Sequence, residues 1–183
     1  MDVEEMVKAS KMGDSKAFFQ LISYNKEKLY KIIYSYLKNE QDTLEGIQEV
    51  TCRAYTKLSS LKKEEHFNTW LIRIAINYCI DENKKKKKII FIDGGEEGLQ
   101  NITTEDIESI DKECINRIVI EAAIEKIKPK YKTPIILKYF HDMTTADISK
   151  ILKIPEGTVK VRVRRGLEQL KSLLSEGGEE IVI

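Results

Sequence analysis

The sequence predicts an all-α protein of two helical domains joined by a flexible acidic linker, with a helix-turn-helix in the second domain. Three observations support this fold class. Leu, Ile, Lys and Glu are plentiful, whereas 183 residues include only 3 prolines and 9 glycines, a mix that favours helices. Apolar residues recur every three or four positions through most of the chain. An acidic segment containing Gly94, Gly95 and Gly98 interrupts this pattern.

The first domain, residues 1–88, is predicted to contain five helices. Asp14 directly follows Gly13 and is a residue type that caps helix N-termini, so one helix is expected to end and another to begin there. Asn39 is expected to end the third helix and Asp42 to cap the fourth, and a polar loop, Ser59–His66, separates the last two. From the apolar spacing we expect helices at Val3–Met12, Asp14–Ile22, Glu27–Leu37, Asp42–Leu58 and from Phe67 into the lysine run Lys84–Lys88.

The segment 89–112 is predicted to be the flexible linker, since it contains seven acids and one base and no helical period persists in it. The second domain, residues 113–176, is predicted to be a four-helix unit. Its helices are expected after Ile115, near Pro129 and Pro134, at Thr144–Leu152 and at Pro155–Leu174. The tail, residues 177–183, receives no predicted role.

The formal net charge of +1 hides an uneven distribution. Between Lys128 and Ser175, eleven Lys or Arg residues stand against four Asp or Glu, a net of +7. Lys84–Lys88 form a second basic block. Basic blocks separated by an acidic segment are typical of DNA-facing surfaces joined by a linker, although solvated surface charge explains each block equally well by itself.

Several classes of protein are disfavoured. No apolar run approaches the ~20 residues that span a bilayer, and the first dozen residues lack the apolar core of a signal peptide. Cys52, Cys79 and Cys114 are widely spaced, which favours buried reduced thiols in a cytoplasmic protein over a disulfide framework or zinc site. His66 and His141 are isolated and no glycine-rich phosphate loop occurs, so we predict no catalytic residue, metal or cofactor.

The most specific local pattern is a helix-turn-helix over residues 144–165. A short amphipathic helix precedes a turn of three or four residues and Pro155, which suits the first position of a new helix. The inward face of this second helix is predicted to consist of Val159, Val163, Gly166, Leu167, Leu170 and Leu174. The opposite face, suited to the major groove, carries the candidate DNA contacts Glu156, Gly157, Thr158, Lys160, Arg162, Arg164 and Arg165. An amphipathic hairpin with an ordinary charged face is the alternative.

The run Ile154-Pro155-Glu156-Gly157-Thr158-Val159-Lys160, followed by Arg162, resembles the promoter-reading helix of extracytoplasmic-function (ECF) sigma factors. Three earlier segments are similar to the same family, in the same order. Gly13–Phe18 resembles its opening motif. Asp42, Gln48-Glu49-Val50 and Arg53-Ala54-Tyr55 resemble the helix that docks on the clamp of the polymerase β′ subunit. Phe67–Asn77, with Asp81 and the basic run, resembles the segment that binds the melted −10 element. The resemblance covers Gly13 to Leu174.

The resemblance implies two contact surfaces in the first domain. Core polymerase is expected to bind Asp42, Gln48, Glu49 and Arg53, and Glu45 falls on the same polar helix face. An intrahelical set of ion pairs is the alternative for Glu45, Glu49 and Arg53. The melted −10 strand is expected at Lys62, Lys63, Arg73, Asn77, Lys84 and Lys85, because amides suit base edges and cations bind phosphates. Trp70 is expected to join the core or to stack on a base.

The resemblance also implies binding partners. The sequence departs from the family pattern at two places. The partners are core RNA polymerase through its β′ clamp and β flap, promoter DNA with a −35 element read as duplex, and a membrane-bound anti-sigma factor. The chain itself is expected to be cytoplasmic, without membrane insertion or catalysis. Glu45-Gly46 stands where Asp followed by Leu or Ile is usual, and Val161 replaces a common Ser. Glycine inside a helix costs about 1 kcal/mol relative to alanine, so a less stable clamp-binding helix is expected.

Two other classes of function remain open on the sequence. A two-domain transcription regulator with the same helix-turn-helix would bind duplex DNA without polymerase, and would not need the Gln48-Glu49 and Trp70–Asn77 segments. A helical adaptor protein would show little affinity for DNA.

Overall fold

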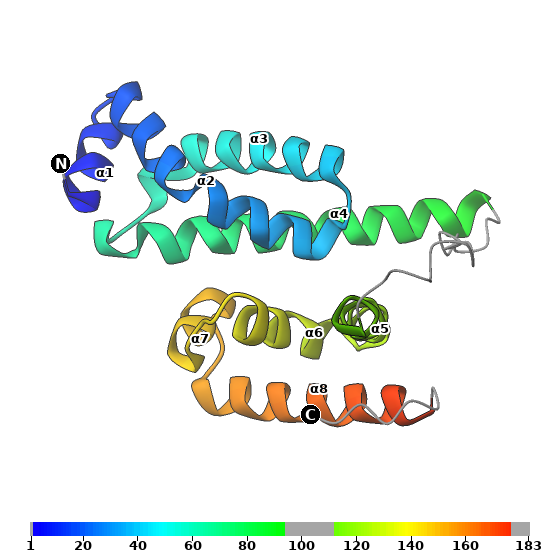
Figure 1. Cartoon of the computed structure of the whole chain (residues 1–183). Helices are drawn as coiled ribbons and strands as arrows, with labels where there is room; N and C mark the ends of the chain where they lie inside the picture. The colour runs from blue at the N-terminus through cyan, green and yellow to red at the C-terminus, as the bar shows by residue number, and fades with distance from the viewer. Residues whose placement is uncertain (1, 94–111, 177–183) are drawn as a thin grey trace. The chain divides into compact units, whose positions relative to one another are not determined.

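The structure, a computed structural model, describes residues 2–93 and 112–176, with side chains placed for residues 2–86 and 119–175 (Figure 1). Every regular element in these ranges is helical, as predicted. The chain divides into two compact units, Met1–Glu96 and Glu97–Ile183. Most of the predicted linker, residues 94–111, and the tail, residues 177–183, lie outside the described ranges.

The first unit begins with α1 (Val3–Lys11), capped by Asp2 and Glu5 in a reciprocal capping box. The chain leaves α1 through Gly13, whose φ of 97° is readily adopted only by glycine. Asp14 then caps the next helix, accepting hydrogen bonds from the backbone N–H groups of Lys16 and Ala17 at 2.9 and 3.1 Å. The predicted helix break at Gly13-Asp14 is confirmed.

A single helix, α2 (Ser15–Leu37), follows this cap. We predicted two helices here, Asp14–Ile22 and Glu27–Leu37, and that division was wrong. The intervening residues include neither proline nor glycine, and Asn25 donates its side-chain N–H to the carbonyl of Leu21 at 2.9 Å, so it bends back on the helix. Leu21 and Leu29 are both buried in the core, so the continuous helix packs inward on both sides of Asn25.

The junction to α3 (Glu40–Lys57) differs from the prediction by three residues. Lys38 adopts the left-handed conformation, with φ of 55°, and Asn39 caps α3 by accepting from the Asp42 N–H at 2.9 Å. We had assigned Asn39 to the end of the preceding helix and the cap to Asp42. Asp42 instead occupies the first turn of α3, where a carboxylate is favoured by the helix dipole.

The connection from α3 to α4 contains two short 3₁₀ turns, Leu58–Ser60 and Glu64–His66, and α4 covers Phe67–Asp93. One stripe of α4 lies in the core of the unit against α2 and α3 (Figure 1). Its fully buried members are Phe67, Leu71, Ala75, Ile76 and Cys79. The helix continues beyond residue 88 to Asp93, into the segment that we assigned to the linker.

The second unit contains α5 (Lys112–Lys126), α6 (Pro129–Ile135), a π-helical turn (Ile136–Phe140), α7 (Thr145–Leu152) and α8 (Glu156–Glu176). Pro134 lies inside α6, where it removes one backbone donor, and the wider π turn begins two residues later. The nearly buried ammonium group of Lys132 pairs with Glu125 at 2.6 Å, which satisfies the charge that α6 brings toward the core.

Helices α7 and α8 form the predicted helix-turn-helix (Figure 1). Thr144 caps α7, and Lys153 turns the chain in the left-handed conformation. The Ser149 hydroxyl donates to the Ile154 carbonyl at 2.6 Å and fixes the turn. Val159 and Val163 are buried as predicted, but Leu167 is 38% exposed and does not belong to the inward stripe. The position of Leu167 is one residue past Gly166, which packs directly on α6.

Replacing Gly166 by alanine is expected to destabilise the second unit by about 1–2 kcal/mol, because overpacking outweighs the gain in helix propensity. A Cβ at Gly166 would lie 2.4 Å from Ile135 Cδ1 and 3.2 Å from both Ile135 Cγ1 and Tyr131 Cβ. Gly157, in the same helix, has nothing within 4 Å of the position that a Cβ would take, so Gly157→Ala is the matched control. Thermal unfolding followed by circular dichroism measures both variants; equal midpoints would contradict the expected packing.

Candidate functional site

The outer face of α8 carries the residues predicted to contact DNA. Five of the seven are exposed, namely Glu156, Gly157, Lys160, Arg164 and Arg165, while Thr158 and Arg162 are half-buried. No heavy atom lies within 4 Å of the position a Cβ would take at Gly157, so a ligand backbone can approach α8 closely there. The buried Val159 and Val163 fix the rotation of the helix. The sequence prediction for this face is consistent with the exposure that the structure gives it.

Arg165 also has a partner within its own unit. Its side chain hydrogen-bonds the Tyr131 hydroxyl, and this bond, followed by that of Lys130, lowers the pKa of Tyr131 below its ordinary value. Arg164 lies 3.8 Å from Glu168, one turn further on. Arg165 of α8 therefore interacts with Tyr131 of α6 as well as carrying charge, which the sequence pattern did not indicate.

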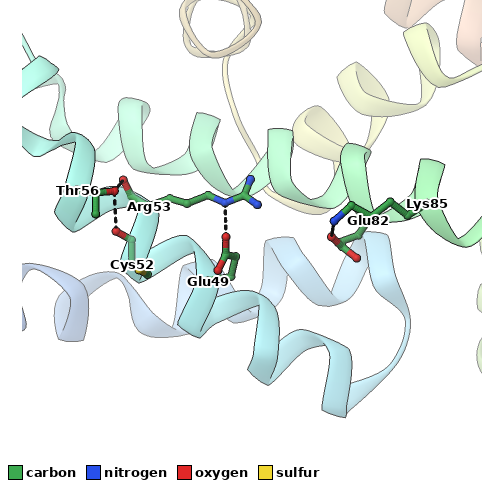
Figure 2. A network of polar contacts seen from close by, with 6 residues as sticks. All are labelled: Glu49, Cys52, Arg53, Thr56, Glu82 and Lys85. Carbon is green, nitrogen blue, oxygen red and sulfur yellow. Dashed lines mark hydrogen bonds and ion pairs between the residues drawn. The ribbon is translucent and has the colours of Figure 1, made fainter.

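A second polar stripe lies on α4. Arg73, Asn77 and Lys84 are separated by four and seven residues, which places them on one side of the helix. Asn77 and Lys84 are exposed, whereas Arg73 is half-buried, and burial lowers the pKa of its guanidinium. Lys85, also predicted to bind DNA, pairs with Glu82 at 2.7 Å (Figure 2). The stripe thus combines the amide of Asn77 with several cations. One of them, Lys85, is already paired with a carboxylate of the protein.

The connection before α4 presents the remaining predicted contacts. Leu58 and Leu61 are buried, and Lys62 and Lys63 follow them as exposed residues at the tip of the turn. Lys63 lies 3.7 Å from Glu65. Trp70 is half-buried, with its ring 5.9 Å from that of Phe67, so part of the indole belongs to the core and part faces outward.

A third surface follows α3 and contains the residues predicted to bind polymerase. Glu45 and Gln48 are exposed, and Glu45 accepts a hydrogen bond from Gln41 at 3.0 Å. Asp42 forms an ion pair with Lys86 of α4. Figure 2 shows Arg53 donating through Nε to Glu49 at 2.6 Å. Glu49 and Arg53 therefore form the intrahelical ion pair that we gave as the alternative to polymerase binding. Both side chains remain partly exposed.

Gly46 lets α3 approach α4 closely. A Cβ at this position would lie 2.8 Å from Tyr78 Cε1 and 3.0 Å from Ile33 Cγ2. The Arg53 guanidinium lies over the same tyrosine ring, 5.3 Å from its centroid. Burial, and then the nearby Glu82, raises the pKa of Tyr78. The glycine that we expected only to weaken α3 thus makes room for the ring that supports Arg53, and sequence reasoning missed Tyr78.

Comparison with known proteins identifies the family. Profiles described as Sigma-70 region 2 and Sigma-70 region 4 match residues 21–89 and 117–170. The ECF RNA polymerase sigma factor SigW of Bacillus subtilis is 35% identical, covering 96% of this chain and 98% of the relative. The chain belongs to the ECF family of RNA polymerase sigma factors. As a sigma factor it directs promoter-specific transcription initiation, and sigma factors are not a family of catalytic enzymes.

Other sigma factors and solved structures agree with this assignment. RNA polymerase sigma factor SigV of B. subtilis is 27% identical, over 85% of this chain and 89% of its own. CnrH in complex with the cytosolic domain of CnrY has a similar fold, with a TM-score of 0.70, 17% identity and coverage of 95% and 97%. RpoE in complex with the anti-sigma factor NepR from Bartonella quintana gives a TM-score of 0.65, 21% identity and coverage of 87% and 98%.

The cysteines of this sigma factor differ in accessibility. Cys79 is buried as predicted, but Cys52 is exposed on α3, which corrects the expectation of buried thiols. The Cys114 side chain lies outside the described residues. Among the described residues, no group of three or more His, Cys, Asp or Glu side chains is arranged to hold a metal ion, and no helix there is long and apolar enough to cross a membrane.

Alkylation of the native protein at pH 8 is expected to modify Cys52 and to spare Cys79. Burial raises the pKa of Cys79 to about 12, so only about one Cys79 in 10⁴ is the reactive thiolate at this pH. Peptide mass spectrometry after iodoacetamide treatment measures each site separately, and treatment in denaturant is the control in which both react. Equal native labelling of the two cysteines would contradict the packing of α4.

Proposed function

We propose that this ECF sigma factor reads the −35 element as duplex through α8, captures the melted −10 strand through α4 and the turn before it, and binds core polymerase through α3. The observation that carries the proposal is the exposure of three separate polar faces on helices whose opposite faces are buried. Each face contains the residue types that its proposed partner requires. Binding energy gained only from an unpaired strand favours the open promoter by population shift, with no chemical step.

The proposed duplex contact begins at the N-terminus of α8. Glu156, Thr158 and Lys160 lie in its first turns, the part of a recognition helix that reaches base edges. Arg162 and Arg164 follow and suit phosphates or guanine edges. Arg165, which bonds Tyr131, is proposed to position α8 in addition to any phosphate contact.

The proposed single-strand contact combines Asn77, the half-exposed Trp70 and the surrounding cations. An amide can hydrogen-bond an unstacked base edge, and an aromatic ring provides a sequence-tolerant stacking surface. Arg73, Lys84, Lys85, Lys62 and Lys63 supply phosphate contacts. The pair of the exposed Lys85 with the half-buried Glu82 stays open to water on the lysine side and contributes about 1 kcal/mol or less, so a phosphate replaces the carboxylate at little cost.

The proposed polymerase contact is the α3 face with Asp42, Glu45, Gln48, Glu49 and Arg53, docking on the β′ clamp, and the second unit contacts the β flap. We also propose control by an anti-sigma factor. CnrH and RpoE, which share the fold, were solved in complex with CnrY and with the anti-sigma factor NepR. The family resemblance implies a membrane-bound regulator for this chain, and the sigma factor itself acts in the cytoplasm, where core polymerase is found.

Run-off transcription with purified core polymerase and a genomic promoter library tests this proposal. Addition of the chain is expected to yield new transcripts from a restricted set of templates that share upstream sequences. Co-elution of the chain with core polymerase is measured in parallel. Absence of both, with protein shown to be folded, would contradict the proposal and favour a regulator that binds duplex DNA alone.

Lys160→Ala is expected to weaken holoenzyme binding to a −35 duplex and to lower the slope of log Kd against log salt by about 0.9, the value for one phosphate contact. Lys171→Ala is the matched control, because Lys171 is exposed on the same helix about 16 Å further along its axis. Fluorescence anisotropy at four salt concentrations measures both variants. Identical slopes for the two would place Lys160 outside the DNA contact.

A further inference from the structure

Lys11, the last residue of α1, connects this helix to the turn before α4. Its ammonium group donates to the backbone carbonyl of Leu61 at 2.6 Å and to Glu64 Oε1 at 2.7 Å. These two acceptors lie immediately before and immediately after Lys62 and Lys63. One cation on α1 therefore holds both ends of the exposed tip that carries two proposed phosphate contacts.

We propose that Lys11 is a positioning residue for −10 recognition, holding the Leu61–Glu64 turn in the shape that the melted strand binds. The inference rests on the proposed function of this turn. It gives α1, which precedes the family motifs described above, a role in promoter recognition. Lys11 acts through the turn and not by touching DNA. Its two bonds order the turn before the strand arrives, which reduces the conformational entropy lost on binding.

The turn depends on Lys11 for its attachment to α1, because the backbone hydrogen bonds of its two 3₁₀ turns join only residues three apart in sequence. Leu61 is buried before the tip and Phe67 after it, and between them no side chain is buried. A backbone hydrogen bond within this stretch joins the His66 N–H to the Lys63 carbonyl at 3.1 Å, on the side of the tip nearer α4. Lys11, by contrast, is rigidly mounted, since Met6, Val7 and Ser10 anchor α1 in the core.

The surroundings of the ion pair strengthen it. The side chains of Lys11 and Glu64 are only 22% and 24% exposed, so water screens their attraction less than at an open surface. The hydrogen bond from Lys11 is the main cause that lowers the pKa of Glu64. Glu64 also offsets the repulsion that Lys11 and the two tip lysines would otherwise exert on each other.

The test uses holoenzyme reconstituted from core polymerase and the full chain. The probe is a forked promoter duplex with the non-template strand unpaired across the −10 element, taken from a promoter that the wild-type protein transcribes. Each unpaired base is replaced in turn, and the ratio of Kd values for substituted and original forks gives the discrimination at that position. Lys11→Met is expected to reduce the largest of these ratios by about tenfold, the effect of losing hydrogen bonds to a charged group.

Two further variants separate positioning from direct phosphate contact. Glu64→Gln keeps the Lys11 bond to Leu61 but removes the anionic acceptor, and is expected to reduce discrimination in the same direction by less. If Lys11 touched phosphate itself, Lys11→Met would weaken binding to every fork by the same factor and leave the ratios unchanged. Lys8→Met is the control: Lys8 is exposed one turn earlier on α1 and acts on Glu64 only through a weak charge interaction, so discrimination is expected to stay within about twofold.

Retained discrimination in folded Lys11→Met and Glu64→Gln proteins would overturn the inference, whatever the change in absolute Kd. Where Lys11→Met fails to fold, as judged by circular dichroism, Glu64→Gln decides by itself. Lys11→Arg, which retains the charge and two donors, is expected to recover part of the lost discrimination. Wild-type holoenzyme that initiates at no promoter would overturn the proposed function instead, a result distinguishable from loss of discrimination in the variants alone.

Discussion

The rotational setting of α4 is the constraint on which the functional surfaces of the first unit depend. Its buried stripe contains large side chains whose exposure would cost about 1.5–3 kcal/mol each, and Phe67 and Leu71 are fully inaccessible. The helix cannot turn about its axis without exposing them. That setting points Asn77 and Lys84 to solvent and directs the Tyr78 ring toward α3. The proposed strand-binding stripe and the support for Arg53 are therefore two consequences of one packing arrangement.

Close approach at glycine extends this constraint to the other functional helices. Gly46 brings α3 against Tyr78 of α4, and Gly166 brings α8 against Ile135 of α6. Each glycine costs about 1 kcal/mol of helix propensity, but a methyl group at either place would overlap a packed side chain. Gly46, which is unusual for the family, thus provides the space that the Tyr78 ring occupies. In both units, a glycine on the buried face of a helix sets the position of the polar face that we propose as a contact surface.

Features governed by local patterns could be predicted from the sequence, and features governed by distant contacts could not. The Asp14 cap, the helix-turn-helix and the exposed face of α8 follow from neighbouring residues. The division of α2 into two helices misread a local pattern, since the residues between Ile22 and Glu27 include neither proline nor glycine. The bond from Arg165 to Tyr131 joins two helices through their tertiary packing, and the exposure of Leu167 depends on how closely Gly166 meets α6. Residue types therefore predicted the candidate contacts, whereas their supports required the structure.

Acidic partners moderate the basic surface of the first unit. Lys63, Lys85 and Lys86 each lie beside a carboxylate, on Glu65, Glu82 and Asp42 respectively. Non-specific affinity for DNA grows with the number of phosphates neutralised. These ion pairs therefore lower the affinity of the first unit for DNA of any sequence. Groups proposed to read bases, such as Asn77, would then contribute a larger share of the binding energy. Because Asp42 belongs to the α3 face and Lys86 to α4, a partner that competes for Asp42 also changes the charge that α4 offers to a phosphate.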